Sequence, residues 1–149
     1  MTSESHFAAD SHSASALTRW FEGLDIGQRA RLRHCHNPMD VVLEPVFHQL
    51  AGRLKEIDSR RLAPIAWTLS HIRGHDQRSL GKAFKEKVSE PRFRRLLEAA
   101  DRDELANDLR STVRLLGNRA NIVEVARVIY WWGDSERRRL ATEYYGGTE

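Results

Sequence analysis

Apolar residues recur every three or four positions through most of this sequence, and this periodicity restricts its fold more than any other feature. The first example is the set Leu17, Trp20, Phe21 and Leu24, which follows the spacing i, i+3, i+4, i+7. That spacing places the side chains on one face of an amphipathic helix. No segment shows the sustained alternation of a half-buried strand. The sequence therefore predicts an all-α helical bundle without a sheet.

Local start and stop signals divide this periodicity into successive helices. In a capping box, the first side chain accepts a hydrogen bond from the backbone three residues later, and the second side chain bonds back. Three pairs fit this pattern: Asp25 with Gln28, Asp101 with Glu104, and Asn121 with Glu124. Pro45 predicts the first turn of another helix. We expect helices near 17–24, 25–35, 45–54, 62–72, 80–87, 93–100, 101–116, 121–132 and 135–145.

The spacing of these helices predicts how the 149 residues are organised. Residues 1–14 show no periodicity over most of their length and are expected to form a flexible N-terminal tail. Residues 15–88 would form an N-terminal helical sub-bundle with an irregular connection at 75–89. Residues 89–146 would form a second sub-bundle, because four helices joined by short loops are typical of an antiparallel bundle.

Signals for secretion or membrane insertion are missing from the sequence. The N-terminus has no apolar signal core, and no apolar run approaches the roughly 20 residues needed to span a bilayer. Cys35 is the single cysteine, which excludes an intrachain disulfide. We therefore expect a cytoplasmic protein that does not contact a membrane.

The segment 74–82 resembles a phosphate-binding loop but does not meet its requirements. Such a loop places four residues between its glycines and ends in Lys-Ser/Thr after a strand. Here six residues separate Gly74 from Gly81, Ala83 follows Lys82, and no strand is predicted before them. The segment therefore predicts no nucleotide site.

The cluster His34-Cys35-His36 is the one group with metal-ligand chemistry. Consecutive residues on a helix point about 100° apart, so these three side chains do not converge on one ion. Acidic residues gather at 101–108, where they suit the start of a helix rather than a paired-carboxylate site. The sequence predicts no metal, no cofactor and no enzyme.

Positive charge is the remaining functional signal. The chain has 20 arginines against four lysines, a net charge of +3 and a pI near 9.3. Arginine grips phosphate through a planar fork of donors, although a GC-rich genome also enriches arginine. Seven basic residues against two acidic ones fall between Arg78 and Arg95. A concentration of that kind is typical of a surface that binds a phosphate backbone.

Other basic residues repeat at helical spacing or occupy helix starts. Arg29 with Arg33, and Arg110 with Arg114, are separated by four positions. Arg60-Arg61 and Arg137-Arg138-Arg139 fall in first turns, where positive charge opposes the helix dipole and so hints at an external partner.

Aromatic residues gather at Tyr130-Trp131-Trp132. Such rings can stack on unpaired bases. Trp132 continues the apolar stripe of its helix, however, so packing in the core or at an interface is the favoured interpretation of this cluster.

Several of these segments together resemble the small subunit of the type I-E CRISPR Cascade complex, the CasB family. The similarity covers the chain from about Leu17 to Tyr145. The motifs that carry it are Ala30-Arg-Leu-Arg33, Pro45-Val-Phe-His-Gln-Leu50, Ser79-Leu-Gly-Lys-Ala83, Arg92-Phe-Arg-Arg-Leu-Leu97, Leu109-Arg110, and Trp131-Trp132-Gly133 followed by Glu136-Arg137. Their order and spacing, rather than any single motif, make the match.

The resemblance implies a non-catalytic subunit that works as a pair of copies within a crRNA-guided complex. Family members contact the backbone and large subunits around the crRNA–target duplex. They stabilise the R-loop by binding the displaced non-target DNA strand. Forming an R-loop replaces a DNA duplex by an RNA–DNA duplex. The two duplexes have nearly equal free energy, so a few protein contacts can favour the open state.

The predicted strand-binding residues come from two sources. The resemblance implies roles for Arg33, Arg60, Lys82, Arg92 and Arg110, and the charge pattern adds Arg29, Arg61, Arg95, Arg114 and Arg137. Ser111 departs from the family's tendency to place a second arginine after Arg110, and Arg114 would compensate. A helical protein–protein adaptor without nucleic-acid contact is the main alternative. A small enzyme with an unrecognised site would require a deep pocket with a perturbed carboxylate or histidine.

Overall fold

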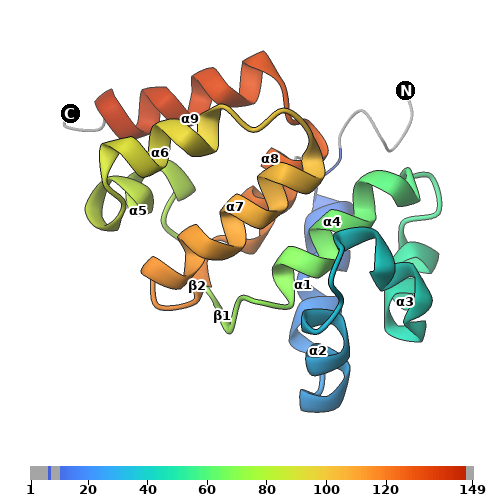
Figure 1. Cartoon of the computed structure of the whole chain (residues 1–149). Helices are drawn as coiled ribbons and strands as arrows, with labels where there is room; N and C mark the ends of the chain where they lie inside the picture. The colour runs from blue at the N-terminus through green and yellow to red at the C-terminus, as the bar shows by residue number, and fades with distance from the viewer. Residues whose placement is uncertain (1–6, 8–10, 147–149) are drawn as a thin grey trace.

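The structure is a computed structural model that describes Phe7 and residues 11–146. This part of the chain is mostly helical and contains two very short strands (Figure 1). The elements are α1 (Ser11–Glu22), α2 (Ile26–Arg33), the 3₁₀ helix η2 (Pro38–Leu43), α3 (Pro45–Arg53), α4 (Ser59–Leu69), β1 (Gly74–His75), α5 (Leu80–Lys87), α6 (Glu90–Leu97), α7 (Arg102–Leu115), β2 (Arg119–Ala120), α8 (Ile122–Tyr130) and α9 (Asp134–Gly146). The predicted helical class is confirmed.

Helix starts follow the capping residues predicted from the sequence. The Asp25 carboxylate accepts from the Gln28 amide at 2.7 Å, and the Gln28 side chain accepts from the Asp25 amide at 3.0 Å. Asp101 and Asn121 accept in the same way from the amides of Glu104 and Glu124. These bonds satisfy amides that have no partner within the helix. Helix α5 occupies the predicted 80–87.

The absence of a sheet, however, was predicted wrongly. β1 and β2 pair in parallel, with Gly74 beside Arg119 and His75 beside Ala120. Each strand has only two residues, so no alternating pattern marks it. The pairing depends on the crossing of α4 and α7, which brings together segments more than 40 positions apart.

Helix α4 lies at the centre of the molecule. Every residue from Leu62 to Ser70 is buried. The helix packs against η2, α2 and α3 on one side and against α7 and α8 on the other (Figure 1). Because α4 contacts both sets, the buried apolar residues form one cluster rather than two. The predicted division at residues 88 and 89 stays a prediction.

The beginning of the described chain differs from the predicted tail of residues 1–14. Residues 1–6 and 8–10 lie outside the described residues, whereas α1 begins at Ser11. Phe7 is fully buried, its ring lies 4.4 Å from that of Tyr130, and its carbonyl accepts from the Trp131 indole at 3.2 Å. An aromatic side chain of this size stabilises the fold when it is buried. None of the described helices is long and apolar enough to cross a bilayer.

Candidate nucleic-acid interface

The ten predicted basic residues are distributed over six helices. They are Arg29 and Arg33 on α2, Arg60 and Arg61 on α4, Lys82 on α5, Arg92 and Arg95 on α6, Arg110 and Arg114 on α7, and Arg137 on α9. The contacts of their side chains show which of these residues stabilise the fold and which are available to a partner.

Arg29 is directed into the protein. Its guanidinium donates to the carbonyl of Ile72 at 2.7 Å and to that of Phe21 at 3.4 Å, and it lies 4.9 Å from the centre of the Phe21 ring. Burial, together with the charge of Arg33, lowers the pKa of Arg29. These contacts join α2 to the ends of α1 and α4, so stabilisation of the fold accounts for this arginine.

Arg137 and Arg61 also make internal contacts. Arg137 donates to the carbonyls of Leu97 and Ala99 at 2.9 Å, and it lies 4.7 Å from the centre of the Trp132 ring. Arg61 lies over the Tyr130 ring at 4.8 Å. Backbone carbonyls and aromatic faces attract guanidinium groups as phosphate does, so sequence alone does not separate the two uses.

A second group lies where α2, the end of α4 and α7 meet, and we call it the α7 cluster: Arg33, His71, Arg110 and Arg114. Arg33 and Arg114 are exposed, whereas Arg110 and His71 are half-buried. The charges of all three arginines act on His71. Burial and these charges lower the pKa of His71 to about 4. The cluster is therefore a concentrated positive surface with one neutral imidazole inside it.

Arg92 and Arg95 on α6 form a smaller group beside α7. Both act electrostatically on Asp108, where burial raises the pKa of the carboxyl and the two arginine charges oppose that shift. Arg95 is exposed and Arg92 is half-buried. Helix α7 thus carries Arg110 and Arg114 of the α7 cluster and also Asp108, on which Arg92 and Arg95 act.

Arg60 and Lys82 are exposed on different elements. The start of α5, which carries Lys82, is closed to phosphate, because the Leu80 amide donates to Glu124 at 2.7 Å and the Gly81 amide donates to Glu143 at 3.2 Å. Helix N-termini bind anions through such amides only when these are free. Lys82 can therefore contribute a point charge, but its helix start cannot contribute a phosphate site.

The basic run 78–95 is partly neutralised within the fold. Arg78 pairs with Asp76 and Glu86, and Arg94 lies 3.7 Å from Glu90. By contrast, Arg33, Arg60, Arg95 and Arg114 form no ion pair within the part of the chain that the structure describes. Their charge is available to an external anion.

The aromatic cluster is used inside the fold. Tyr130 is fully buried, and the indole nitrogens of Trp131 and Trp132 donate to the carbonyls of Phe7 and Ala99. Tyr130 lies in the core and the two half-buried tryptophans pack against it, which agrees with the predicted packing in the core or at an interface. Base stacking would require a ring face that is free of such contacts.

Comparisons with known proteins identify the family to which this chain belongs. The family model of the CRISPR-associated protein Cse2 matches residues 28–145. The chain belongs to the Cse2 family, also called CasB. A chain in the crystal structure of E. coli Cascade bound to a PAM-containing dsDNA target is 27% identical, with a TM-score of 0.75 over 93% of this chain and 98% of that chain. No curated protein sequence matches this one. The Cse2 family is non-catalytic, and the related E. coli chain is part of a Cascade complex bound to a DNA target.

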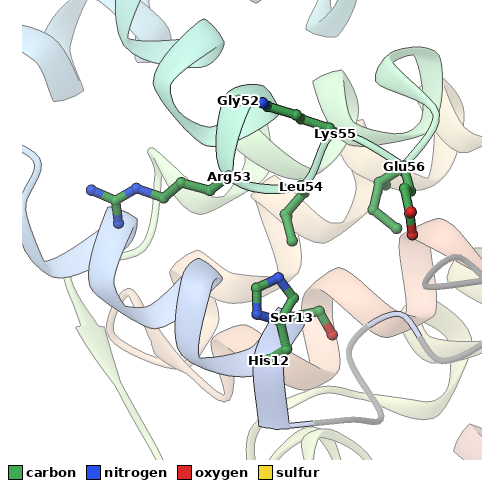
Figure 2. Close-up of a pocket in the computed structure, with 8 residues that line it drawn as sticks. His12, Ser13, Gly52, Arg53, Leu54, Lys55 and Glu56 are labelled. Atoms are coloured by element: carbon green, nitrogen blue, oxygen red, sulfur yellow. The ribbon is translucent and has the colours of Figure 1, made fainter.

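One pocket in the described part of this Cse2 chain is lined by none of the ten predicted basic residues. It has a volume of about 360 Å³ and lies between α1 and the segment that follows α3. Figure 2 shows Leu54 pointing toward His12 and Ser13, while Arg53 extends away from them. The rim carries charges of both signs, from Arg53, Lys55 and Glu56. His71, with its displaced pKa, does not line it.

The Cys35 segment carries no metal-binding geometry in this Cse2 chain. His34 caps the end of α2, and the Cys35 thiol donates to the Arg31 carbonyl at 3.4 Å. Within the described residues, no group of three potential ligands converges on one point.

His71 is the member of the candidate site that the sequence analysis missed. It follows a run of buried residues in α4. His75 stands four positions later, but it lies in β1 and its Nδ1 accepts from the Ile122 amide. Only the packing of α2 and α7 around it brings the three arginines close, so no sequence signal marked it.

Proposed function

We propose that this Cse2 subunit binds the displaced non-target DNA strand and bridges neighbouring subunits, thereby stabilising the R-loop. The observation that carries the proposal is a set of exposed arginines around α7 that form no ion pair with any other described residue: Arg33, Arg95 and Arg114. Arg92 and Arg110 flank them. Arginines that are not neutralised and show no base-reading pattern suit phosphate contacts that are indifferent to sequence.

The related E. coli chain belongs to a Cascade structure bound to a dsDNA target. A complex that opens such a duplex exposes a single strand. The RNA–DNA duplex that forms is about as stable as the DNA duplex that it replaces. A basic surface of modest size is therefore sufficient to favour the open state.

Apolar surface supports the bridging part of the proposal. Ile26 is 89% exposed and Leu43 is 76% exposed, so each offers an aliphatic side chain for a partner to cover. We infer that they contact neighbouring subunits or the second copy of this chain. The alternative, an adaptor without nucleic-acid contact, would use these residues and leave the arginines without a role.

The test is single-stranded DNA binding by the purified chain across a series of salt concentrations. Each phosphate contact to a single strand contributes about −0.7 to the slope of log K against log salt. The variant Arg92→Ala/Arg95→Ala/Arg114→Ala is expected to flatten that slope by about 2. A charge-matched control, Arg19→Ala/Arg53→Ala/Arg138→Ala, removes exposed arginines on α1, α3 and α9 and is expected to keep the slope.

If both variants flattened the slope equally, net charge alone would explain the binding, and a localised path for the strand would be contradicted. If the isolated chain binds too weakly to measure, the same two variants are compared within the reconstituted complex by the stability of the open R-loop. Unchanged R-loop stability in both would favour the adaptor.

A further inference from the structure

Three pockets of the described structure share lining residues and join into one groove along α1. The pocket of Figure 2 shares His12 and Arg53 with a second pocket of about 670 Å³. That second pocket shares Ser15 and Arg19 with a third of about 320 Å³. We call this continuous depression the α1 groove, and its lining comes from residues 11–16, 18–19 and 52–57.

Small side chains on α1 leave room for the groove. Ser11, Ala14, Ser15 and Thr18 follow the spacing i, i+3, i+4, i+7, so they share one face of the helix. The large apolar residues of α1 are buried. The groove therefore follows the side of α1 that does not form the core.

Positive charge borders the α1 groove. Arg19, Arg53 and Lys55 are exposed and line it. None of the three forms an ion pair with another described residue. Arg19 of α1 and Arg53 of α3 line the same pocket, so a carboxylate placed there would meet two guanidinium groups. Guanidinium–carboxylate bonds are among the stronger hydrogen bonds of proteins.

The chemistry of the groove suits a protein segment better than a nucleic-acid strand. Leu54 and Ile57 line it beside the charges, and Glu56 adds a carboxylate to its rim. A phosphate backbone is repelled by a carboxylate and gains little from aliphatic side chains. A protein segment can cover the aliphatic residues while its own carboxylates pair with the arginines, and an apolar centre with a polar rim is typical of protein interfaces.

We propose that the α1 groove binds an acidic segment of a neighbouring protein subunit. Carboxylates of that segment would pair with Arg19 and Arg53, and an aliphatic side chain would cover Leu54 and Ile57. The proposal rests on the bridging part of the proposed function and deepens it, because it gives the bridge a site and a chemistry. It does not depend on strand binding, since none of the ten residues predicted for that role lines the groove.

The experiment identifies what lies on the groove by photo-crosslinking. The residue p-benzoylphenylalanine replaces the exposed Ser15 in the full chain, the complex is assembled with the other subunits, and mass spectrometry identifies the cross-linked partner. The same replacement at Gln49, which is exposed on α3 and does not line the groove, controls for position.

A charge reversal in the Ser15 background tests the role of the two arginines. Arg19→Glu/Arg53→Glu is expected to lower the cross-link yield by at least about fivefold, because two ion pairs are replaced by two repulsions. Arg73→Glu/Arg138→Glu makes the same change of net charge at exposed arginines outside the groove and is expected to keep the yield.

A Ser15 cross-link to a carboxylate-rich protein segment that is lost in Arg19→Glu/Arg53→Glu supports the inference, whichever subunit supplies the segment. A second copy of this chain would satisfy it through its exposed acidic residues, such as Asp103 and Glu104. A cross-link to nucleic acid overturns the assignment to a protein. No cross-link at Ser15, or equal yields in the two charge variants, overturns the site.

Failure of the groove and failure of strand binding are distinguishable. Salt-dependent binding of single-stranded DNA without a Ser15 cross-link overturns the groove and leaves strand binding standing. A Ser15 cross-link that meets the criterion in a chain without strand binding supports the groove and leaves the bridging role alone.

Discussion

Some arginines of this chain stabilise the fold and others remain available to a partner. Arg137 is the clearest example of the first group. It links α9 to the carbonyls of Leu97 and Ala99 while covering the Trp132 ring. Hydrogen bonds to charged groups contribute about 1.5–3 kcal/mol each. Arg137→Ala leaves these carbonyls with fewer donors, and it should lower the free energy of unfolding by about 2–3 kcal/mol in urea denaturation.

The neighbouring residue supplies the control. Arg138 is exposed and has no ion pair within the described part of the chain. Arg138→Ala should therefore change the free energy of unfolding by less than about 0.5 kcal/mol. Equal effects of the two substitutions would contradict the internal role of Arg137.

His71 also makes the stability of the free chain depend on pH. Its pKa is about 4 in the folded chain and about 6.5 in an unfolded one. Between these values the unfolded state binds more protons, so the free energy of unfolding falls as pH decreases from about 6.5 to about 4. The ring is partly open to solvent, so we expect about 1–2 kcal/mol from this group.

Urea denaturation at pH 7.5 and pH 5 measures this effect. His71→Gln should lose less stability than the wild type between the two pH values, whereas His36→Gln should follow the wild type. Parallel losses in all three proteins would show that His71 titrates normally when the chain is folded.

At the scale of elements, the contact between α5 and α9 depends on a glycine. A Cβ atom at Gly81 would overlap the side chain of Glu143, whose carboxylate also accepts from the Gly81 amide. Overpacking of this kind typically costs about 1–3 kcal/mol. Gly81→Ala should therefore lower the thermal midpoint, measured by circular dichroism, by several degrees.

Gly52 offers the matched comparison, since it lies in α3 and a Cβ there meets nothing within 4 Å. Alanine is favoured over glycine in helices by about 0.5–1 kcal/mol, so Gly52→Ala should raise the midpoint slightly. If Gly81→Ala also raised the thermal midpoint, the close approach of α5 and α9 would be contradicted.

Helix boundaries were predictable where the signal is local. Asp25, Asp101 and Asn121 cap their helices through atoms only three residues away, so the sequence contained the whole interaction. The pairing of β1 with β2 was not predictable, because it requires the crossing of α4 and α7. Phe7 is a similar case, since its partner Tyr130 belongs to a distant helix.

The sequence predicted which residues bring positive charge to the candidate site, but not which of its arginines make contacts inside the fold. Arg33, Arg110 and Arg114 were predicted from motif and spacing, whereas His71 was not predicted. Arg29 and Arg137 resembled the exposed arginines, because their acceptors are backbone carbonyls, which every sequence position carries.

At the scale of the whole molecule, α4 decides whether the chain behaves as one unit. It packs against η2, α2 and α3 on one side and α7 and α8 on the other, and α1 also reaches α8. A rigid connection of this kind would transmit the position of one end of the subunit to the other. It would thereby keep the α7 cluster fixed relative to the exposed residues Ile26 and Leu43.

The chain should consequently unfold in one cooperative transition, although its sequence predicts sub-bundles at 15–88 and 89–146. Neither set of helices can lose its structure without exposing the side of α4 that the other set covers, and that face is fully buried. Single domains of this size usually unfold in this all-or-none manner. Urea unfolding followed by circular dichroism and tryptophan fluorescence should give coincident midpoints. Hydrogen exchange of peptides from α3 and α9 should report the same free energy, whereas two separate values would divide the molecule at α4.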